Sequence, residues 1–233
     1  MSNATVKTLS ESAYAQLRDD IIAGRLAPQA KLRIEELRQD YQTSASPLRE
    51  ALNRLAGEGF VTAEGQRGFR VAPVSLKDLN EITRLRILLE SEAIRESIRY
   101  GDTDWEASIL AAFHRMSKAD AERDENIPEW ETRNDEFHEA LIAACDSKRL
   151  LDLRRSLYEQ HKRYRLISIL EHDESRDVGA EHRAIMEAAL ARNAAAACKA
   201  TETHIMRTVE VTERALLHLT ATDPERESVS GPA

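Results

Sequence analysis

Hydrophobic residues recur every three or four positions along most of this chain, which is the spacing of one face of an α-helix. Ala13, Leu17 and Ile21 mark such a face and predict a first helix over 10–24. A second, shorter helix is predicted over 34–41. The chain therefore opens with two helices, and the elements after them decide the type of domain.

The third helix comes after a polar turn, Gln42-Thr43-Ser44-Ala45. We predict that it begins near Ser46-Pro47, because serine caps helices well and proline is tolerated at the first helical position. Leu48, Leu52 and Leu55 then form its buried stripe. Two helices joined by a short turn make a helix-turn-helix, in which the second helix enters the major groove of DNA.

A small hairpin is predicted directly after the third helix. Its strands are 60–63 and 69–72, and the loop 64–68 between them contains two glycines and Arg67. Such a loop can approach a phosphate or the minor groove. Helix, turn, helix and hairpin together predict a winged helix-turn-helix domain over 1–73.

No strand pattern is found after residue 75. Helical patterns predict six segments: 75–99, 103–122, 127–144, 147–171, 174–191 and 193–218. Short connections between helices favour an antiparallel bundle, here over 74–219. The predicted fold class is therefore mainly α: a winged helix-turn-helix followed by an all-α bundle. The polar tail, 220–233, is predicted to be disordered.

Composition agrees with a helical protein. Of 233 residues, 42% are hydrophobic but only 5% are aromatic, and glycine (8) and proline (6) are scarce. No apolar run approaches the roughly 18 residues of a membrane span, and no secretory signal is visible. Cys145 and Cys198 lack metal-pair spacing and are expected as small buried thiols, so we expect a cytoplasmic protein without membrane contact.

Charge is distributed unevenly. The net charge is −8, which by itself disfavours DNA binding. Residues 1–73 hold 10 Lys/Arg against 9 Asp/Glu, whereas the remainder holds 23 against 32. An acidic body can be held away from phosphate while a near-neutral head binds it, with an affinity that depends on salt.

The predicted DNA-binding residues lie in the turn, on the exposed face of the third helix and in the wing loop: Ser44, Ser46, Arg49, Asn53, Arg54, Arg67 and Gly68. The three arginines are expected to contact phosphate, and Ser46 or Asn53 to read bases. For Arg49, the competing interpretation is an internal ion pair with Glu50 or Glu58.

Four segments of the head match a known pattern: Gln16-Leu17-Arg18, Ile21 to Pro28, Ser46 to Leu52, and Arg67-Gly68. On these residues, the head resembles the winged-helix domain of GntR-type bacterial transcription regulators. Three positions depart from that pattern. Ala45 replaces an arginine that often contacts DNA, Gly57 offers no side chain where some members have a basic one, and Gln29 replaces a usual glycine. DNA binding is expected, but not to the family's common operator.

The body matches a second pattern at Arg84-Leu85-Arg86 with Leu89-Glu90, Asn134 to His138, Glu181 to Ile185, and His204. On these residues, it resembles the FadR-type ligand-binding (FCD) domain, an all-helical bundle. The combined resemblance covers about residues 10–218. It implies a homodimeric regulator that responds to a small metabolite, in most cases by losing DNA binding, as a repressor does.

His138, His182 and His204 fall on the inward stripes of three different predicted helices. Asn134 precedes His138 by four residues, so both point the same way from one helix. Three converging imidazoles can bind Zn, Ni, Cu or another divalent ion. Each histidine taken singly is better explained as a hydrogen-bonded core residue. The FCD pattern of three helical histidines plus one carboxylate favours a metal site.

Asn134 stands where that pattern usually has an aspartate. A neutral amide oxygen is the weaker ligand, so we expect weaker binding of Zn or Ni than at an aspartate site, or a site filled by water or by an anionic effector. Asp135 points about a quarter turn away and is not expected to replace it.

Arg86 is the candidate for binding an effector carboxylate in fork geometry. An ion pair with Glu90, one helical turn later, explains this arginine equally well. The remaining histidines are expected on the solvated surface: His114, His161, His172 and His218. Four arginines in basic runs are also expected there: Arg133, Arg155, Arg163 and Arg165.

The sequence therefore predicts a ligand-responsive, DNA-binding transcription regulator rather than an enzyme. A homodimer would place two recognition helices about one helical turn apart on a palindromic site. A metabolite, expected to be a carboxylate, would bind beside the metal and favour one of two arrangements of the heads.

Two other functions remain open. A metal with three histidine ligands and an open position can activate water, so the alternative is a metal-dependent hydrolase. Against it, Glu136 and Glu181 diverge by about 100° from the histidines beside them on their helices. In the third interpretation, the chain is a helical dimer whose histidine cluster is only structural.

Overall fold

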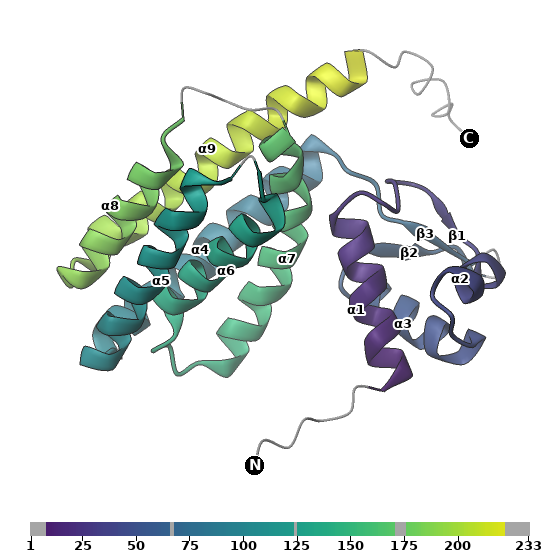
Figure 1. Cartoon of the computed structure of the whole chain (residues 1–233), viewed down its shortest axis with the longest axis horizontal. Coiled ribbons are helices and arrows are strands. Elements are labelled where there is room, and N and C mark those ends of the chain that lie inside the picture. Colours follow the sequence, from purple (N-terminus) through teal and green to yellow (C-terminus); the bar gives the residue numbers. More distant parts are fainter. Residues whose placement is uncertain (1–7, 66–67, 124, 171–175, 222–233) are drawn as a thin grey trace.

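The computed structural model describes residues 8–65, 68–123, 125–170 and 176–221, without the side chains of 167–170 and 218–221. Figure 1 shows a small N-terminal unit of helices and strands beside a larger bundle of helices. The predicted fold class is confirmed. No helix in the described part of the chain combines the length and the apolar character that a membrane crossing requires.

The N-terminal unit is a winged helix-turn-helix. Its elements in chain order are α1 (Leu9–Ile22), β1 (Lys31–Leu32), α2 (Ile34–Asp40), α3 (Ala45–Gly57), β2 (Val61–Ala63) and β3 (Phe69–Val71). The strands form one antiparallel sheet in the order β1-β3-β2, with Lys31 opposite Arg70 and Val61 opposite Val71. The predicted hairpin thus gains a third strand from the segment before α2.

α3 begins earlier than the capping pattern predicts. Ser44, not Ser46, is the N-cap residue, and its side chain makes no capping hydrogen bond. Pro47 is therefore the third residue of the helix, where its missing N–H is still not needed, because the first four N–H groups have no partner within a helix. Leu48 and Leu52 are completely buried. Their packing against the rest of the head, rather than a side-chain cap, determines where this helix lies.

Two glutamines of the head adopt the left-handed backbone conformation. Gln29 has φ +65° and Gln42, in the turn before α3, has φ +48°. This conformation costs a residue with a side chain roughly 1–2 kcal/mol, and glycine avoids that cost. The geometry explains why glycine is usual at position 29 in the GntR-type regulators that the head resembles.

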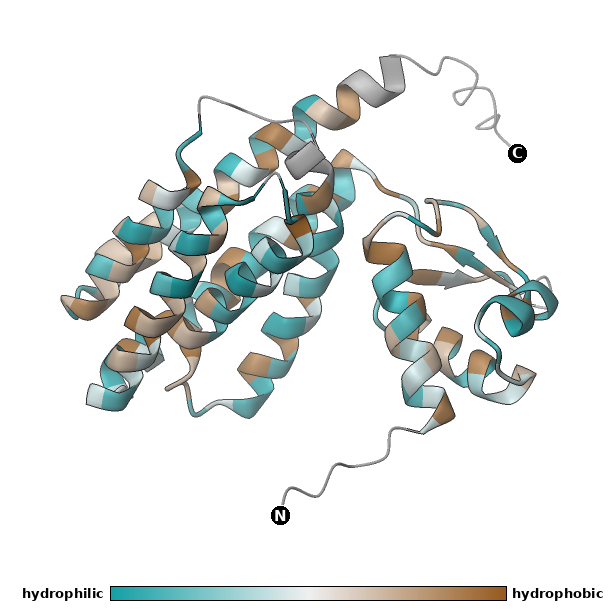
Figure 2. Ribbon diagram, in the orientation of Figure 1, coloured by the Kyte–Doolittle hydropathy of each residue, from teal (hydrophilic) through white to brown (hydrophobic). Residues whose placement is uncertain are grey.

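The bundle contains the six helices that the sequence predicts: α4 (Leu76–Tyr100), α5 (Thr103–Ala121), α6 (Ile127–Ile142), α7 (Lys148–Leu170), α8 (Val178–Leu190) and α9 (Ala194–Ala221). Ser75 caps α4 by accepting the Asp78 N–H. α4 lies against α7 and α9, and α5 packs against α6 and α8. In Figure 2, hydrophobic and hydrophilic residues alternate along each helix, as burial of one side requires.

The predicted disordered tail cannot be compared over most of its length, because residues 222–233 lie outside the described residues. Its first two residues, 220 and 221, belong to the end of α9.

The surface position predicted for several polar residues of α7 is wrong. His161, Arg163 and Arg165 are all buried, although Arg155 is exposed as predicted. The cause is tertiary: α7 lies between the head and the rest of the bundle (Figure 1), so two of its faces are covered. His114 is exposed as predicted, and Arg133 is partly exposed in ion pairs with Glu129 and Glu136. The side chains of His172 and His218 lie outside the described residues.

Candidate metal centre and nucleic-acid interface

His138 of α6, His182 of α8 and His204 of α9 meet inside the bundle. The distances between ring centroids are 5.4 Å for His138–His182, 5.3 Å for His138–His204 and 4.7 Å for His182–His204. One ligand atom from each ring lies within 4.8 Å of the other two, and all three side chains are buried. The convergence expected from the helical stripes is therefore present.

Several nitrogen atoms of this cluster have no hydrogen-bond partner among the described residues. They are Nε2 of His138 and both ring nitrogens of His182. A buried polar atom left unpaired costs about 1–3 kcal/mol, so such atoms call for an explanation. Imidazole nitrogens without partners, gathered from separate helices, are a donor set that suits a divalent transition metal.

The histidines of the cluster are held in the neutral form. Burial, and next the neighbouring imidazoles, keep the pKa values of His138 and His182 well below the usual range. Burial also lowers the pKa of His204, although the Glu181 carboxylate opposes the shift. A neutral imidazole presents a lone pair at neutral pH, which is the form that ligates a metal.

Glu181 orients His204 from behind. Its Oε2 lies 2.8 Å from Nδ1 of His204, so Nε2 of the same ring is left for the cluster. The carboxylate also accepts from Arg176 Nε (3.0 Å) and Arg207 (2.9 Å). Burial raises the pKa of Glu181, but His204 and Arg176 outweigh it and hold the pKa below its usual range. The sequence placed Glu181 off the ligand face, and this supporting role was not predicted.

Neither Glu181 nor Glu136 is placed as a general base. Glu181 is occupied by Arg176, Arg207 and His204, and Glu136 forms ion pairs with Arg115 and Arg133. Neither carboxylate therefore supports the hydrolase alternative.

Asn134 lies one turn before His138 and is buried with it. Its Nδ2 donates to the Tyr158 hydroxyl at 3.1 Å, and that hydroxyl donates to Asp135 Oδ1 at 2.8 Å. Asp135 also pairs with Lys162 (2.5 Å) and Arg165 (3.0 Å), so its carboxylate is engaged away from the histidines, as predicted. A ligand role for Asn134 stays a prediction.

Arg86 forms the ion pair that the sequence offered as one of two interpretations. Its Nε lies 3.2 Å from Glu90 Oε1, and its Nη1 lies 2.9 Å from Nδ1 of His161. Glu90 is shared with Arg154 of α7, whose Nε lies 3.1 Å away. The guanidinium of Arg86 also stacks over the Tyr158 ring at 4.5 Å. Effector contact by Arg86 stays a prediction.

A small cavity is lined by one of the three histidines, His204. Its volume is about 20 Å³, room for about one water molecule. Its lining is Arg123, Trp130, Asn134, Arg165, Arg176, Val178, His204 and Thr208. Of the three guanidinium groups in this lining, Arg165 is paired with Glu131 and Asp135, and Arg176 is paired with Glu181. The Nε of Arg123 has no hydrogen-bond partner among the described residues, so Arg123 is the group that suits the cavity to an anion. As it stands, the cavity is too small for a metabolite, so a larger ligand requires side chains to move.

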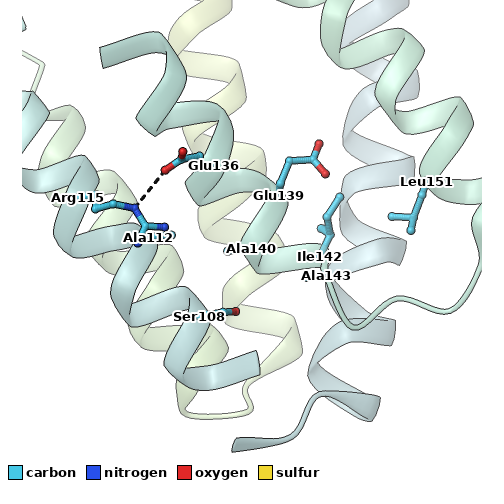
Figure 3. A pocket seen from close by; sticks show the side chains of 9 residues that line it. All are labelled: Ser108, Ala112, Arg115, Glu136, Glu139, Ala140, Ile142, Ala143 and Leu151. Carbon is cyan, nitrogen blue, oxygen red and sulfur yellow. Dashed lines mark hydrogen bonds and ion pairs between the residues drawn. The ribbon is translucent and has the colours of Figure 1, made fainter. Parts of the chain in front are cut away.

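A far larger hollow lies elsewhere. The pocket in Figure 3 has about 410 Å³ and lies at the surface between α5, α6 and the first turns of α7. None of the three histidines lines it, and its charged groups are engaged, as the Arg115–Glu136 pair at 3.1 Å shows (Figure 3). Size alone therefore does not locate the site.

The predicted DNA-binding residues divide into free and engaged side chains. Arg49 and Asn53 are exposed on α3, and Arg49 forms no ion pair within the described ranges. Arg54 instead pairs with Glu58 at 3.1 Å and stacks on the Tyr14 ring at 3.7 Å. This removes the Glu58 partner suggested for Arg49 and makes Arg49 the better candidate for phosphate.

The turn and the wing hold the remaining candidates. Ser44 and Ser46 are exposed at the start of α3. Gly68 has φ +99°, a conformation that favours glycine in the wing. Arg67 lies outside the described residues.

Both parts of this chain match known protein families. Residues 9–71 match the gntR family of bacterial regulatory proteins, and residues 81–207 match the FCD domain. The chain belongs to the GntR family and carries an FCD domain. This GntR protein is 39% identical over 213 residues to the uncharacterized HTH-type transcriptional regulator BphR of Paraburkholderia xenovorans, across 89% of this chain and 86% of BphR.

Two further relatives extend the comparison. The GntR protein is 34% identical to the HTH-type transcriptional repressor GlaR of Escherichia coli, across 89% of this chain and 97% of GlaR. The solved structure of E. coli McbR/YncC superposes with a TM-score of 0.76 and covers 90% of this chain and 99% of that one. At 19% identity, that structure shows the fold alone. The two family matches and the relatives BphR and GlaR establish a transcription regulator that binds DNA.

Proposed function

We propose that this GntR protein is a repressor that senses a small anionic metabolite, a carboxylate, at a metal site in its FCD domain. The observation that carries the proposal is the buried cluster of His138, His182 and His204, in which nitrogens of His138 and His182 are unpaired among the described residues and His204 lines a small cavity with three arginines. The name of the relative GlaR, a transcriptional repressor, supports the sign of the response. The proposed DNA-binding and ligand-binding domains are 1–73 and 74–219.

His138, His182 and His204 would hold the ion, with Asn134 as a neutral fourth donor. Zinc or nickel suits such a nitrogen-rich site. The bound metal would supply a Lewis-acid position for a carboxylate oxygen. The protein's own contribution is electrostatic: Arg123 borders the cavity and has an Nε without a hydrogen-bond partner among the described residues, so it would attract an anion. The four neutral donors leave the charge of a divalent ion unbalanced, which further favours an anionic effector. We keep Arg86, behind Tyr158, as a proposed contact of that effector.

Metal titration of variants tests this site. Replacing His182 by alanine should lower the affinity for Ni²⁺ by about 100-fold or more, because one of three imidazole ligands is lost. Replacing Asn134 by aspartate should raise it about tenfold, which corresponds to about 1.4 kcal/mol. Isothermal titration calorimetry measures both, with the exposed His114→Ala as control. Absence of Ni²⁺ and Zn²⁺ binding by the wild-type protein would refute the metal site, and an unchanged affinity in Asn134→Asp would remove Asn134 from it.

The protein is proposed to act as a homodimer through the exposed face of α4. Leu85 and Leu88 are 46% and 61% exposed on this helix, and Leu153 of the adjacent α7 is 60% exposed. A second copy of α4 packed antiparallel about Leu88 would place Arg84 opposite Glu92 of the other copy. Opposite charges at symmetric positions fit a two-fold, self-complementary contact.

Replacing Leu88 by aspartate should convert the dimer to a monomer, because the change puts two buried, unpaired carboxylates at the centre of the contact. Light scattering coupled to size-exclusion chromatography measures the mass directly. Leu110→Asp is the matched control, since Leu110 is 50% exposed on α5, away from this face. A Leu88→Asp protein that stays dimeric would place the contact elsewhere.

Operator binding tests the proposed role of the head. Fragments of the source genome selected by the protein at physiological salt should be enriched in a short palindrome. On that operator, Arg49→Ala should weaken binding and reduce the salt slope by about one unit, because one phosphate contact is lost. Lys118→Ala, exposed on α5, is the control. An unchanged slope in Arg49→Ala would exclude phosphate contact by Arg49.

A further inference from the structure

α7 presents different faces to the histidine site and to the head. Tyr158, His161 and Arg165 lie on one face, at helical spacing. They hydrogen-bond Asn134, Arg86 and the carboxylates of α6 respectively, and Arg165 also lines the cavity beside His204. This face of α7 therefore touches the groups proposed to bind metal and effector.

The opposite side of α7 contacts the winged-helix unit. Gln160 lies against Gly59, just after α3, at 3.5 Å from the position where a side chain would begin. Leu166 packs against the hydrophobic cores of both the head and the bundle. Burial lowers the pKa of the Arg18 guanidinium on α1, but Glu159 of α7, together with Tyr14 and Asp19, outweighs burial and raises the pKa. One helix thus joins the two units.

Arg163 makes the most specific of these contacts. One of its terminal nitrogens donates to the backbone carbonyl of Ala72 at 2.6 Å, directly after β3. Arg163 is only 7% exposed, and no carboxylate within the described ranges forms an ion pair with it. Asp78 acts on it electrostatically but accepts its hydrogen bond from Tyr164, at 2.7 Å.

A buried guanidinium without an ion-pair partner is an expensive feature. Desolvation of an unpaired charge costs several kcal/mol, and one hydrogen bond to a carbonyl recovers only part of it. The contact between Arg163 and Ala72 is therefore specific in geometry but weak in net energy. Those are the properties of a contact that can be made in one arrangement of the two units and released in another.

We propose that Arg163 is the positioning residue that couples the histidine site to the winged-helix domain. The inference rests on the proposed function, because it assumes that binding at the histidines shifts Tyr158, His161 and Arg165. A shift of α7 moves Arg163 relative to Ala72 and changes the placement of the linker that leads from β3 to α4. Through that linker, the site biases where the recognition helix α3 lies.

Hydrogen–deuterium exchange of the full-length protein tests the coupling, with Ni²⁺ alone as the probe. Arg163→Met removes the hydrogen bond and the buried charge at similar volume, and Arg155→Met is the control, exposed on the same helix. Without metal, the segment 69–75, which consists of β3 and the linker, should exchange about fivefold faster or more in Arg163→Met than in the wild type. Ni²⁺ should change exchange of this segment in the wild type and in Arg155→Met, but not in Arg163→Met.

The outcomes separate the coupling from the metal site. If Ni²⁺ slows exchange around His138 and His182 but leaves the linker unchanged in the wild type, the coupling is refuted and the metal site stands. If Ni²⁺ changes neither region, the metal site fails, and the metal-free comparison decides the role of Arg163. Equal linker exchange in Arg163→Met and wild type refutes that role. Should Arg163→Met not fold, Arg163→Lys, which keeps a donor but shortens its reach, takes its place.

Discussion

Replacing Glu90 by glutamine should lower the free energy of unfolding by about 3–5 kcal/mol, the usual cost of breaking a buried ion pair from one side. Glu90 is 1% exposed and receives two guanidinium groups, Arg86 at 3.2 Å and Arg154 at 3.1 Å. Burial raises the pKa of Glu90, but Arg154 and Arg86 outweigh it and lower the pKa. Without the carboxylate charge of Glu90, both guanidinium groups stay buried but lose the negative charge that offsets the cost of their desolvation.

Urea unfolding followed by circular dichroism measures this loss. Glu202→Gln is the matched control, because Glu202 pairs with Lys199 at the exposed surface of α9 and belongs neither to the buried cluster nor to the proposed dimer contact. Such surface pairs contribute about 0–1 kcal/mol, so the control should unfold nearly as the wild type does. A Glu90→Gln protein within about 0.5 kcal/mol of the wild type would show that the buried cluster tolerates the neutral side chain.

The metal-free protein should lose about 4 kcal/mol of stability between pH 7.5 and pH 5.5. Four buried histidines carry the effect: His138, His161, His182 and His204. Burial lowers the pKa of each in the folded state, most strongly for the first three. In the unfolded chain, each histidine takes up a proton near pH 6.5. The unfolded state therefore binds more protons across this window.

The sign of the pH dependence comes from that difference. Stability is fully present above the unfolded pKa and is lost as pH falls toward the lowered pKa values of the fold, with about 1.4 kcal/mol per pH unit for each proton. Lowered carboxylate pKa values, such as that of Glu181, act only at more acidic pH. Denaturant unfolding in the presence of chelator at a series of pH values measures the slope. His182→Phe should flatten it, whereas His114→Ala should not; a wild-type slope of zero would contradict neutral, buried histidines.

Much of the candidate site was predictable because helical spacing is a local property. His138, His182 and His204 occupy inward stripes, and any packing that buries those stripes in one bundle brings the rings together. Asn134 is placed by the same spacing, one turn before His138. For the same reason, the order of helices and the position of the wing were predicted from short-range patterns of hydrophobic residues, turns and glycines.

The errors share a different cause. Ser46 looked like a cap because local chemistry permits it, but the packing of Leu48 and Leu52 starts α3 earlier. His161 and Arg163 looked solvated because basic runs usually are. Nothing local reveals that α7 is covered on two sides, since the covering elements are distant in sequence.

The sequence by itself determined the class of protein, the elements and the three histidines, because hydrophobic periodicity and short motifs act over a few residues. Only the tertiary structure decided which polar groups are paired. It brought Arg154 to Glu90, Glu181 to His204 and Arg163 to Ala72. Pairing of this kind depends on which helices become neighbours and on how they are displaced along their axes relative to one another. Burial removes the water that would otherwise form hydrogen bonds with each of these groups.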